Sequence, residues 1–380
     1  MPGTGELIAL YGAGMVAVSV CCAVKELYKD CHILCFIVSD KAGNPSEIHG
    51  LPVISLEEFC AMDKKKEIRI LVAVPENHHN TISWDLEKRG LTNYIRVDSR
   101  TEADLMERYY NSVPRGSQPS FLSLRSYSMG ARMPSIRVYM ARFHRDTPLK
   151  DPYDPPEWIY PIQAGAGLTK IRVAELLDNT GDNISEKNRN YSELSALYWI
   201  WKNGKNQRDR GCCDGDWHDR VYRGECRYTG LFHYRRILDI TERDFSRLEE
   251  HKIDVVLPYP TIHYPSIDEH HRRYVKDRDW EAMNEALKEL APEYARSLPG
   301  ILSQPYFYNY NMFIARETVF QDFCGWLFPV LERTEELSSP KGWERADRYI
   351  GYLGENLTTL YFLYHKDKLR TVHTGRIMLT

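Results

Sequence analysis

Two arginines and a histidine follow directly after an apolar run, at His233-Tyr234-Arg235-Arg236. The run, Tyr228–Phe232, has the composition of a buried strand, and charged side chains at its end are costly to bury without a partner. Arginine presents a rigid fork of donors that suits phosphate oxygens. The motif therefore indicates an anionic ligand, such as a diphosphate. A structural network of arginines and carboxylates would give the same pattern.

A polar stretch that precedes a predicted helix holds a second group of candidates. The helix is predicted over Leu194–Trp201, where apolar residues share one face. Helix N-capping explains one Ser or Asn before it, but not several. Short polar side chains around exposed helix-start amides suit ribose and sugar hydroxyls. The candidates are Asp182, Asn183, Asn188 and Tyr191, with Asn190 and Glu193 in the same stretch.

The beginning of the chain has a glycine motif in a structural context that makes it informative. The apolar strand Leu7–Tyr11 leads directly into Gly12-Ala13-Gly14-Met15-Val16-Ala17, and apolar residues then recur at helical spacing. The glycines allow a tight turn, and the helix N-terminus offers N–H groups to a phosphate. Asp40 ends the next predicted strand, where a ribose-binding acid would lie, although farther along than a dinucleotide fingerprint requires. Gly12, Gly14 and Asp40 are thus candidate nucleotide-binding residues.

The elements that must position these residues fall into two predicted domains. Predicted strands at 7–11, 33–39, 68–74 and 94–97 alternate with helices, which indicates a parallel, doubly wound sheet. A segment rich in Ser, Pro and Gly follows and predicts a linker over residues 114–134. The first domain is therefore expected over residues 1–113 and the second over residues 135–380.

Composition excludes some classes of function. A formal net charge of -3 over 380 residues argues against a protein that coats nucleic acid. The nine cysteines show no CxxC or Cys/His zinc spacing, so a metal-thiolate site is not expected. The His and Asp residues between His263 and Asp279 do not have ligand spacing and predict a polar loop. No run of about 18 apolar residues occurs, so a cytoplasmic protein is expected, with peripheral membrane attachment left open.

The second part of the chain resembles a known family. Residues from about 136 to 376 are similar to bacterial capsular-polysaccharide glycosyltransferases, long catalogued only as a domain of unknown function. Six motifs carry the resemblance in the same order along the chain. They are G-D-N-I-S-x-K-N (Gly181–Asn188), Y-x-E-L-x-A-L-Y-W-I-W-K-N (Tyr191–Asn203), G-L-x-H-Y-R-R (Gly230–Arg236), Y-N-M-F-I (Tyr310–Ile314), W-L-F (Trp326–Phe328) and G-x-x-x-E-x-L (Gly351–Leu357).

The first part resembles a different set of proteins. Its Gly-Leu-Pro-Val-Ile-Ser segment, Gly50–Ser55, is similar to a turn in the small Rossmann-like modules at the front of sugar O- and N-acyltransferases. That resemblance implies either nucleotide-sugar binding or a scaffold that has lost its ligand. The expected fold class is therefore α/β, with a small N-terminal Rossmann-like domain and a C-terminal GT-A-like α/β/α domain.

The family resemblance also implies where a nucleotide sugar would lie. It would cross the carboxyl ends of the strands, where GT-A enzymes usually carry an Asp-x-Asp pair that holds a divalent metal. His233-Tyr234-Arg235-Arg236 takes that place by motif order, and positive side chains there could offset the departing UDP charge. Asp214-Gly215-Asp216 lies in a polar insertion that predicts a surface loop. A metal-independent reaction without a cofactor is favoured, and Mn²⁺ or Mg²⁺ remains the alternative.

Sugar transfer requires a base for the acceptor hydroxyl, and Glu355 is the candidate. It follows Gly351 and Gly354 closely and stands before the predicted helix Leu357–Tyr364, where the resemblance implies that GT-A folds often carry their base. The alternative is that Glu355 only favours the N-terminus of that helix electrostatically. As the base it would support inversion in a single displacement. Asn309 and Asn311 would contact donor or acceptor hydroxyls, and Asp182, Asn183 and Asn188 would hold the nucleotide or sugar.

The expected function is transfer of a hexose, galactopyranose or galactofuranose, from a UDP-sugar. The acceptor would be an oligosaccharide or an undecaprenyl-linked glycan at the inner face of the plasma membrane. Two other classes remain open on sequence grounds. One is a nucleotide-sugar oxidoreductase or epimerase that works from the first domain, and the other is a non-catalytic nucleotide-binding assembly subunit.

Overall fold

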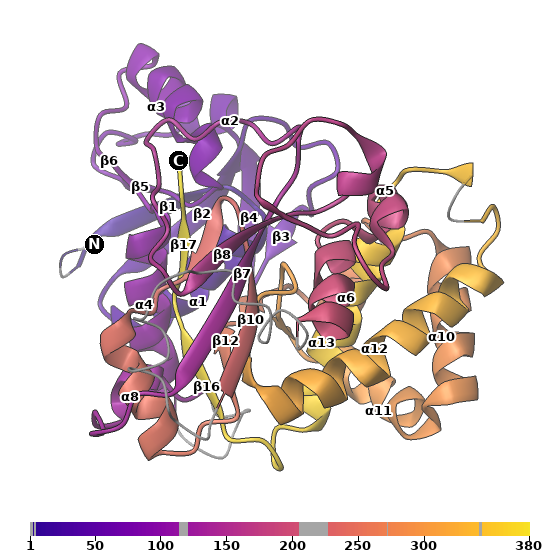
Figure 1. Cartoon of the computed structure of the whole chain (residues 1–380). Helices are drawn as coiled ribbons and strands as arrows, with labels where there is room; N and C mark the ends of the chain where they lie inside the picture. Colours follow the sequence, from indigo (N-terminus) through magenta and orange to yellow (C-terminus); the bar gives the residue numbers. More distant parts are fainter. Residues whose placement is uncertain (1–2, 4, 114–120, 205–226, 272, 342–343) are drawn as a thin grey trace.

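The computed structural model describes residues 3, 5–113, 121–204, 227–271, 273–341 and 344–380. Two β-sheets organise these residues, each with helices packed against it (Figure 1). The N-terminal unit runs from β1 to α4, and the second unit runs from β7 to β17. Within the described ranges, no helix is both long and apolar enough to cross a membrane.

The N-terminal unit is built on a six-stranded sheet with the order β3-β4-β2-β1-β5-β6. All neighbouring strands in it are parallel except β3 and β4. This agrees with the parallel, doubly wound sheet predicted from alternating strands and helices. Its elements are β1 (Leu7–Tyr11), α1 (Met15–Leu27), β2 (His32–Val38), β3 (Glu47–Ile48), β4 (Leu51–Ser55), α2 (Leu56–Ala61), β5 (Arg69–Val72), α3 (His79–Lys88), β6 (Tyr94–Arg96) and α4 (Ser99–Ser112).

The turn between β1 and α1 depends on Gly12. Its φ of +120° is in the region that favours glycine, and a Cβ atom there would lie 2.7 Å from the carbonyl oxygen of Ala73. Gly14 is the N-cap residue of α1 and has a φ of -92°, with no atom within 4 Å of an added Cβ. The two glycines of the motif therefore have different structural requirements.

The second unit is built on a mixed nine-stranded sheet, in which seven strands have the order β16-β12-β15-β10-β7-β8-β9, β11 pairs with β10 and β17 pairs with β11. The strand β15 is antiparallel to both of its neighbours. The elements are β7 (Ser135–Arg142), β8 (Ile159–Gln163), β9 (Leu176–Leu177), α5 (Asn188–Tyr191), α6 (Leu194–Asn203), β10 (Arg227–His233), β11 (Arg236–Leu238), α8 (Glu242–Glu250), β12 (Val255–Pro258), β13 (Thr261–Ile262), α9 (Ile267–His271), α10 (Asp277–Leu290), α11 (Pro292–Leu302), β14 (Tyr306–Phe307), β15 (Phe313–Arg316), α12 (Glu317–Leu337), α13 (Tyr349–Tyr364), β16 (Thr371–Thr374) and β17 (Arg376–Met378).

Apolar side chains of the larger sheet alternate between two cores, because successive residues of a strand point to opposite faces. On β10, Leu231 belongs to the core shared with α6, α12 and α13, whereas Phe232 belongs to the core shared with α8. Both side chains are fully buried. The sheet therefore has apolar layers on both faces, which is the α/β/α arrangement (Figure 1).

The two units contact each other through buried polar groups as well as apolar ones. The backbone N–H of Ile262 donates to Ser19 Oγ on α1 at 3.0 Å, and that of Met378 donates to Ser99 Oγ on α4 at 2.8 Å. Arg376 on β17 forms an ion pair of 3.5 Å with Glu102 on α4. Because β17 also pairs with β11, the N-terminal unit is packed onto the strand that begins at Arg236.

A substitution of each glycine tests the turn before α1. We expect Gly12→Ala to lower the free energy of unfolding by about 1–3 kcal/mol, because the new Cβ would clash with Ala73 at a φ that alanine rarely adopts. Gly14→Ala is the matched control and should change it little. Urea unfolding of the two variants and the wild type gives the comparison, and equal losses in both would contradict this account of the turn.

Candidate functional site

The His233-Tyr234-Arg235-Arg236 motif forms a tight hairpin at the centre of the larger sheet. His233 ends β10, Arg236 begins β11, and these two residues are antiparallel partners, so Tyr234 and Arg235 form the turn between them. The strand β10 lies between β7 and β15. The prediction that this motif follows a buried central strand is therefore confirmed.

The charges of the hairpin arginines act on the carboxyls of Asp146 and Glu355 without an ion pair among the described residues. Among the described residues, neither Arg235 nor Arg236 forms an ion pair with a carboxylate; their nearest recorded partners are the rings of Tyr234, at 5.5 Å, and Tyr310, at 4.3 Å. The Nε atom of Arg235 is buried without a hydrogen-bond partner. A buried cationic donor without a partner is costly, and this atom has hydrogen-bonding capacity left for a ligand.

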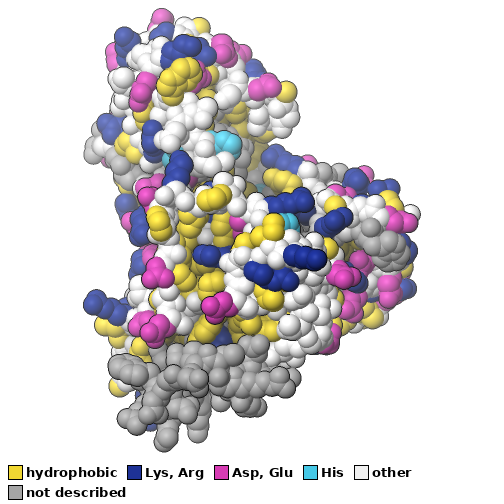
Figure 2. Space-filling view, turned by 45° about the horizontal axis from the view of Figure 1, so that its top comes forward, with side chains coloured by type: hydrophobic (Ala, Val, Ile, Leu, Met, Phe, Trp, Pro, Cys, Tyr) yellow, Lys and Arg dark blue, Asp and Glu magenta, His cyan; other side chains and the backbone are white. Residues whose placement is uncertain are grey.

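The carboxyl of Asp146 lies near the hairpin. It accepts a hydrogen bond from the backbone N–H of Phe143 at 2.7 Å. Burial raises the pKa of Asp146 to about 6, and the N–H of Phe143 and the charges of Arg142, Arg235 and Arg348 oppose the rise. The positive charge at this point therefore extends beyond the tetrapeptide. Figure 2 shows Lys and Arg side chains gathered near the middle of one face of the molecule.

A strained turn, Tyr310-Asn311, lies before β15 and contacts both the hairpin and the helix α13. Both residues have a positive φ, 72° and 48°, which costs energy in residues with side chains. The carbonyl oxygen of Tyr310 lies 2.5 Å from His233 Nε2, and its backbone N–H faces the carboxyl of Glu355 and opposes the rise in the pKa of that carboxyl. One backbone residue therefore contacts both the histidine of the hairpin and the predicted base.

The side chains of the same turn reach further charged groups. The ring of Tyr310 lies 4.3 Å from the guanidinium of Arg236 and 5.0 Å from that of Arg376. Asn311 Nδ2 donates to Glu193 Oε1 at 2.7 Å, and Asn311 Oδ1 accepts from Thr358 Oγ1 at 2.9 Å. The hydrogen bond from Thr358 thereby orients the side-chain amide of Asn311, and this amide in turn holds the carboxylate of Glu193 in place. The sequence did not single out Glu193 as a site residue, nor Arg376.

Glu355 lies well inside α13 rather than before it. The helix begins at Tyr349, so the expectation that Glu355 precedes the helix is corrected, and an effect at the helix N-terminus does not account for the residue. Gly354 explains the close approach of this helix to its neighbour, because an added Cβ would lie 2.6 Å from Leu194 Cδ1 at the start of α6. Glycine at this position therefore allows Glu193 and Glu355 to lie near each other.

The environment of Glu355 suits proton transfer near neutral pH. Burial raises the pKa of Glu355 to about 8, and the neighbouring charge of Glu193 adds to the rise. The backbone N–H of Tyr310 and the charges of Arg348 and Arg236 oppose it. A carboxyl in a low-dielectric site beside another carboxyl behaves in this way.

Burial also lowers the pKa of His233, with Glu193 opposing the shift and Arg236 adding to it. A neutral imidazole can donate from Nε2 to the carbonyl oxygen of Tyr310, and that role matches the observed contact. His233 therefore supports the strained turn from the hairpin side.

The predicted polar stretch before α6 holds its own loop together. Asn183 bridges Gly181 and Ser185, Asn188 donates to Ser192 O at 2.6 Å and to Ser195 Oγ at 2.9 Å, and Tyr191 donates to Glu335 at 3.1 Å. Asp182 accepts from Tyr198 and is exposed. These contacts fix the backbone that leads to Glu193. Ligand binding by Asp182, Asn183, Asn188 and Tyr191 remains a prediction.

The two predicted asparagines before β15 lie in different surroundings. Asn309 is buried and accepts a hydrogen bond from Thr261. It is not among the residues that act on the pKa of Glu355. Asn311 belongs to the site through Glu193. The structure therefore brings together His233, Arg236, Asn311 and Glu355, with Tyr234 and Arg235 in the hairpin, and adds Glu193, Tyr310, Arg348 and Arg376.

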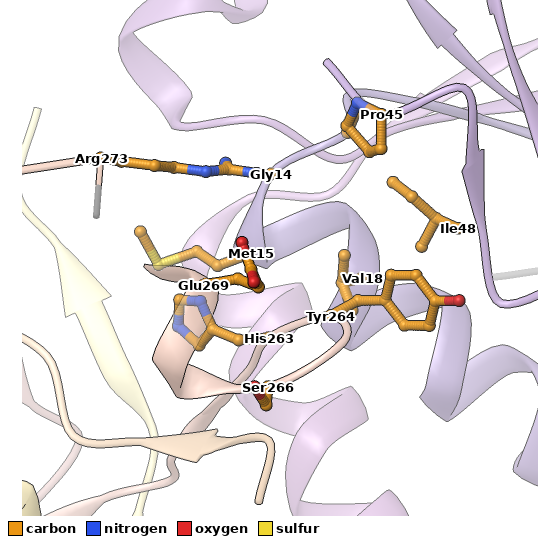
Figure 3. A pocket seen from close by; sticks show the side chains of 11 residues that line it. Gly14, Met15, Val18, Pro45, Ile48, His263, Tyr264, Ser266, Glu269 and Arg273 are labelled. Carbon is orange, nitrogen blue, oxygen red and sulfur yellow. The ribbon is translucent and has the colours of Figure 1, made fainter. Parts of the chain in front are cut away.

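The glycine motif of the N-terminal unit lines a separate pocket between the two units. Gly14 lies opposite Arg273, Glu269 and His263 from the second unit, and Figure 3 shows Arg273 extending toward it. Asp40 is exposed, accepts from the backbone N–H of Ala42 at 2.9 Å, and is not among the residues that line this pocket. Nucleotide binding by Gly12, Gly14 and Asp40 remains a prediction.

The described part of the chain contains no group of three or more His, Cys, Asp or Glu side chains arranged to hold a metal ion. The pair Asp214 and Asp216 lies outside the described residues. A metal-independent reaction therefore stays a prediction, which is based on the positive charge of the arginine hairpin.

The fold and the site define an α/β protein with a Rossmann-like N-terminal unit and a GT-A-like α/β/α domain, as expected from the sequence. Residues 137–367 match the family described as "Domain of unknown function (DUF4422)", and the chain belongs to this family. No match was found among curated proteins.

One solved structure supports the fold assignment. It is the apo structure of the bifunctional glycosyltransferase WbbM, with a TM-score of 0.50 and 24% sequence identity. The match covers 65% of this chain but only 45% of that protein. At this level of identity the likeness establishes the fold.

The pKa of Glu355 predicts an unusual dependence of stability on pH. Because the folded state raises this pKa to about 8, it favours the protonated form, and its contribution to stability is lost as pH rises from about 4.5 to 8. Glu355→Gln mimics the protonated form. We expect the free energy of unfolding of the variant to exceed that of the wild type by about 1–3 kcal/mol at pH 8 and to differ little from it at pH 4.5. Urea unfolding measures the difference.

The exposed Glu186→Gln substitution controls for the loss of one negative charge. A Glu355→Gln protein whose stability differs from the wild type equally at both pH values would show that the carboxyl is not held protonated.

Proposed function

We propose that this chain is a glycosyltransferase that moves a hexose from a UDP-sugar to an oligosaccharide or undecaprenyl-linked acceptor in surface-polysaccharide synthesis. The single observation that carries the proposal is the position of Tyr310, whose backbone lies beside both the arginine hairpin, at His233, and the carboxyl of Glu355, whose pKa burial raises to about 8. These are the two groups that a displacement at an anomeric carbon needs. The family membership and the fold likeness support it.

The hairpin is proposed to bind the diphosphate of the donor. Arg235 has a buried Nε atom without a hydrogen-bond partner. The guanidiniums of Arg236 and Arg376 both lie over the ring of Tyr310. Arginine donors that are held in place before the reaction can stabilise charge as it develops on the leaving group. In this proposal the arginines perform the role that a divalent metal has in other sugar transferases, and the donor hexose is galactose in pyranose or furanose form.

Glu355 is proposed to be the general base. As the acceptor oxygen bonds to the anomeric carbon, its proton passes to the Glu355 carboxylate, and the bond to the diphosphate oxygen breaks. The acceptor oxygen supplies the electron pair of the new bond, and the diphosphate oxygen keeps the pair of the broken bond. UDP leaves with its negative charge stabilised by the arginines, and the anomeric centre is inverted. A base whose pKa is near 8 has a strong affinity for the proton but is ionised in only a minority of molecules at neutral pH.

The N-terminal unit is proposed to bind a nucleotide at Gly14 or to act as a scaffold for β17 and Arg376. The reaction would take place at the cytoplasmic face of the membrane, where lipid-linked acceptors and UDP-sugars meet. Peripheral association with that membrane is part of the same proposal.

Binding and turnover separate the two proposed roles. Arg235→Ala should weaken UDP binding about 10- to 100-fold, because a charge-assisted contact to phosphate is lost. Glu355→Gln should leave UDP binding unchanged but lower UDP-galactose turnover at least about 100-fold. Calorimetry with UDP and release of UDP from UDP-galactose measure the two effects, each with and without EDTA.

The exposed Arg296→Ala substitution on α11 is the control for loss of a positive charge. Normal turnover in both Arg235→Ala and Glu355→Gln would eliminate the proposed mechanism. Complete loss of wild-type turnover in EDTA would eliminate its metal independence.

The pH profile of the reaction provides an independent test. Turnover should rise about tenfold per pH unit below about pH 8 and level off above it, because the ionised fraction of Glu355 limits the rate. Residual turnover of Glu355→Gln should lack this slope. A wild-type profile that is already flat near pH 5 would exclude a base with a raised pKa.

A further inference from the structure

Two tyrosines, Tyr274 and Tyr352, lie near Glu355. Tyr352 precedes Glu355 by three residues on α13, and residues at this spacing share one face of a helix. The ring of Tyr274, from the segment before α10, lies 5.1 Å from the ring of Tyr352 at an angle of 30°. Tyr274 is 47% exposed, so part of this aromatic pair is accessible to solvent.

The electrostatic surroundings place this pair within the same site. Burial raises the pKa of Tyr274, Arg273 opposes the rise, and the charges of Tyr352, Tyr310 and Glu355 add to it. The guanidinium of Arg348, one turn before Tyr352, lies 6.0 Å from the Tyr352 ring. The aromatic pair is therefore continuous with the groups that surround Glu355.

We propose that Tyr274 and Tyr352 form a subsite for a sugar ring of the acceptor, with the ring stacked on Tyr274 and its reactive hydroxyl directed at Glu355. The inference rests on the proposed function and names the acceptor as a neutral pyranoside with an apolar face. A pyranose presents C–H groups on one face and hydroxyls around its edge. Tyrosine matches this pattern, because it offers an apolar ring with a polar tip.

The position of the pair favours the acceptor over the uracil of the donor, which could also stack on a tyrosine. A general base must lie within hydrogen-bond reach of the hydroxyl that it deprotonates. A group one helical turn from Glu355 is therefore beside the acceptor. The uracil is separated from the reacting carbon by ribose and diphosphate, so it lies beyond the arginines.

Saturation-transfer NMR of methyl β-D-galactopyranoside with the full chain, in the presence of saturating UDP, tests the subsite. The wild type should saturate mainly the hydrogens on the apolar face of the sugar. Tyr274→Ala should weaken sugar binding about threefold to tenfold, in keeping with the strength of ring contacts, and Tyr274→Phe should retain it. Trp84→Ala is the matched control, because Trp84 is 62% exposed on α3 of the other unit.

The affinity for UDP, measured by calorimetry, distinguishes this inference from the function on which it rests. Unchanged UDP binding in Tyr274→Ala, together with weaker sugar binding, supports the acceptor subsite. Weaker UDP binding in that variant would assign the tyrosines to the uracil and overturn the inference, as would equal sugar signals in Tyr274→Ala and the wild type or no sugar signal in the wild type. A wild type that binds no UDP would instead refute the proposed function.

Discussion

The backbone of Tyr310 is the feature on which the candidate site depends. Its carbonyl oxygen lies 2.5 Å from His233 Nε2 and its N–H faces the carboxyl of Glu355, so one residue lies between the cationic hairpin and the acidic group. Two consecutive residues with positive φ, Tyr310 and Asn311, are required for that arrangement. Such strain persists only where the surrounding structure holds it. Here the support comes from His233, from Thr358 and from Arg236 and Arg376, which both lie over the Tyr310 ring.

Close helix packing supplies the second half of the site. Gly354 lets α13 approach the start of α6, which brings Glu193 near Glu355 and raises the pKa of Glu355 in addition to the effect of burial. The polar residues before α6 stabilise the loop that carries Glu193. The N-terminal unit contributes from the opposite side, because α4 supports β17 and pairs Glu102 with Arg376. The site therefore depends on both units of the chain.

Local sequence patterns predicted the features that local physics decides. The strand–glycine–helix order of β1 and α1 and the strand before His233 could each be predicted from neighbouring residues, whereas the role of Glu355 stays a prediction. The start of α13 was misplaced because its glycines look like helix breakers, whereas packing against α6 requires them. Glu193, Arg348 and Arg376 were not selected as site residues, because only long-range packing brings them to Glu355 and Tyr310. No spacing along the chain encodes such a contact.

A structure of the protein with bound UDP tests the central claim most directly. The account predicts that the phosphate oxygens lie within hydrogen-bond distance of the Arg235 and Arg236 guanidiniums, with the terminal phosphate on the Glu355 side of the hairpin. UDP bound only at Gly14 between the two units, with those guanidiniums turned to protein carboxylates, would contradict it.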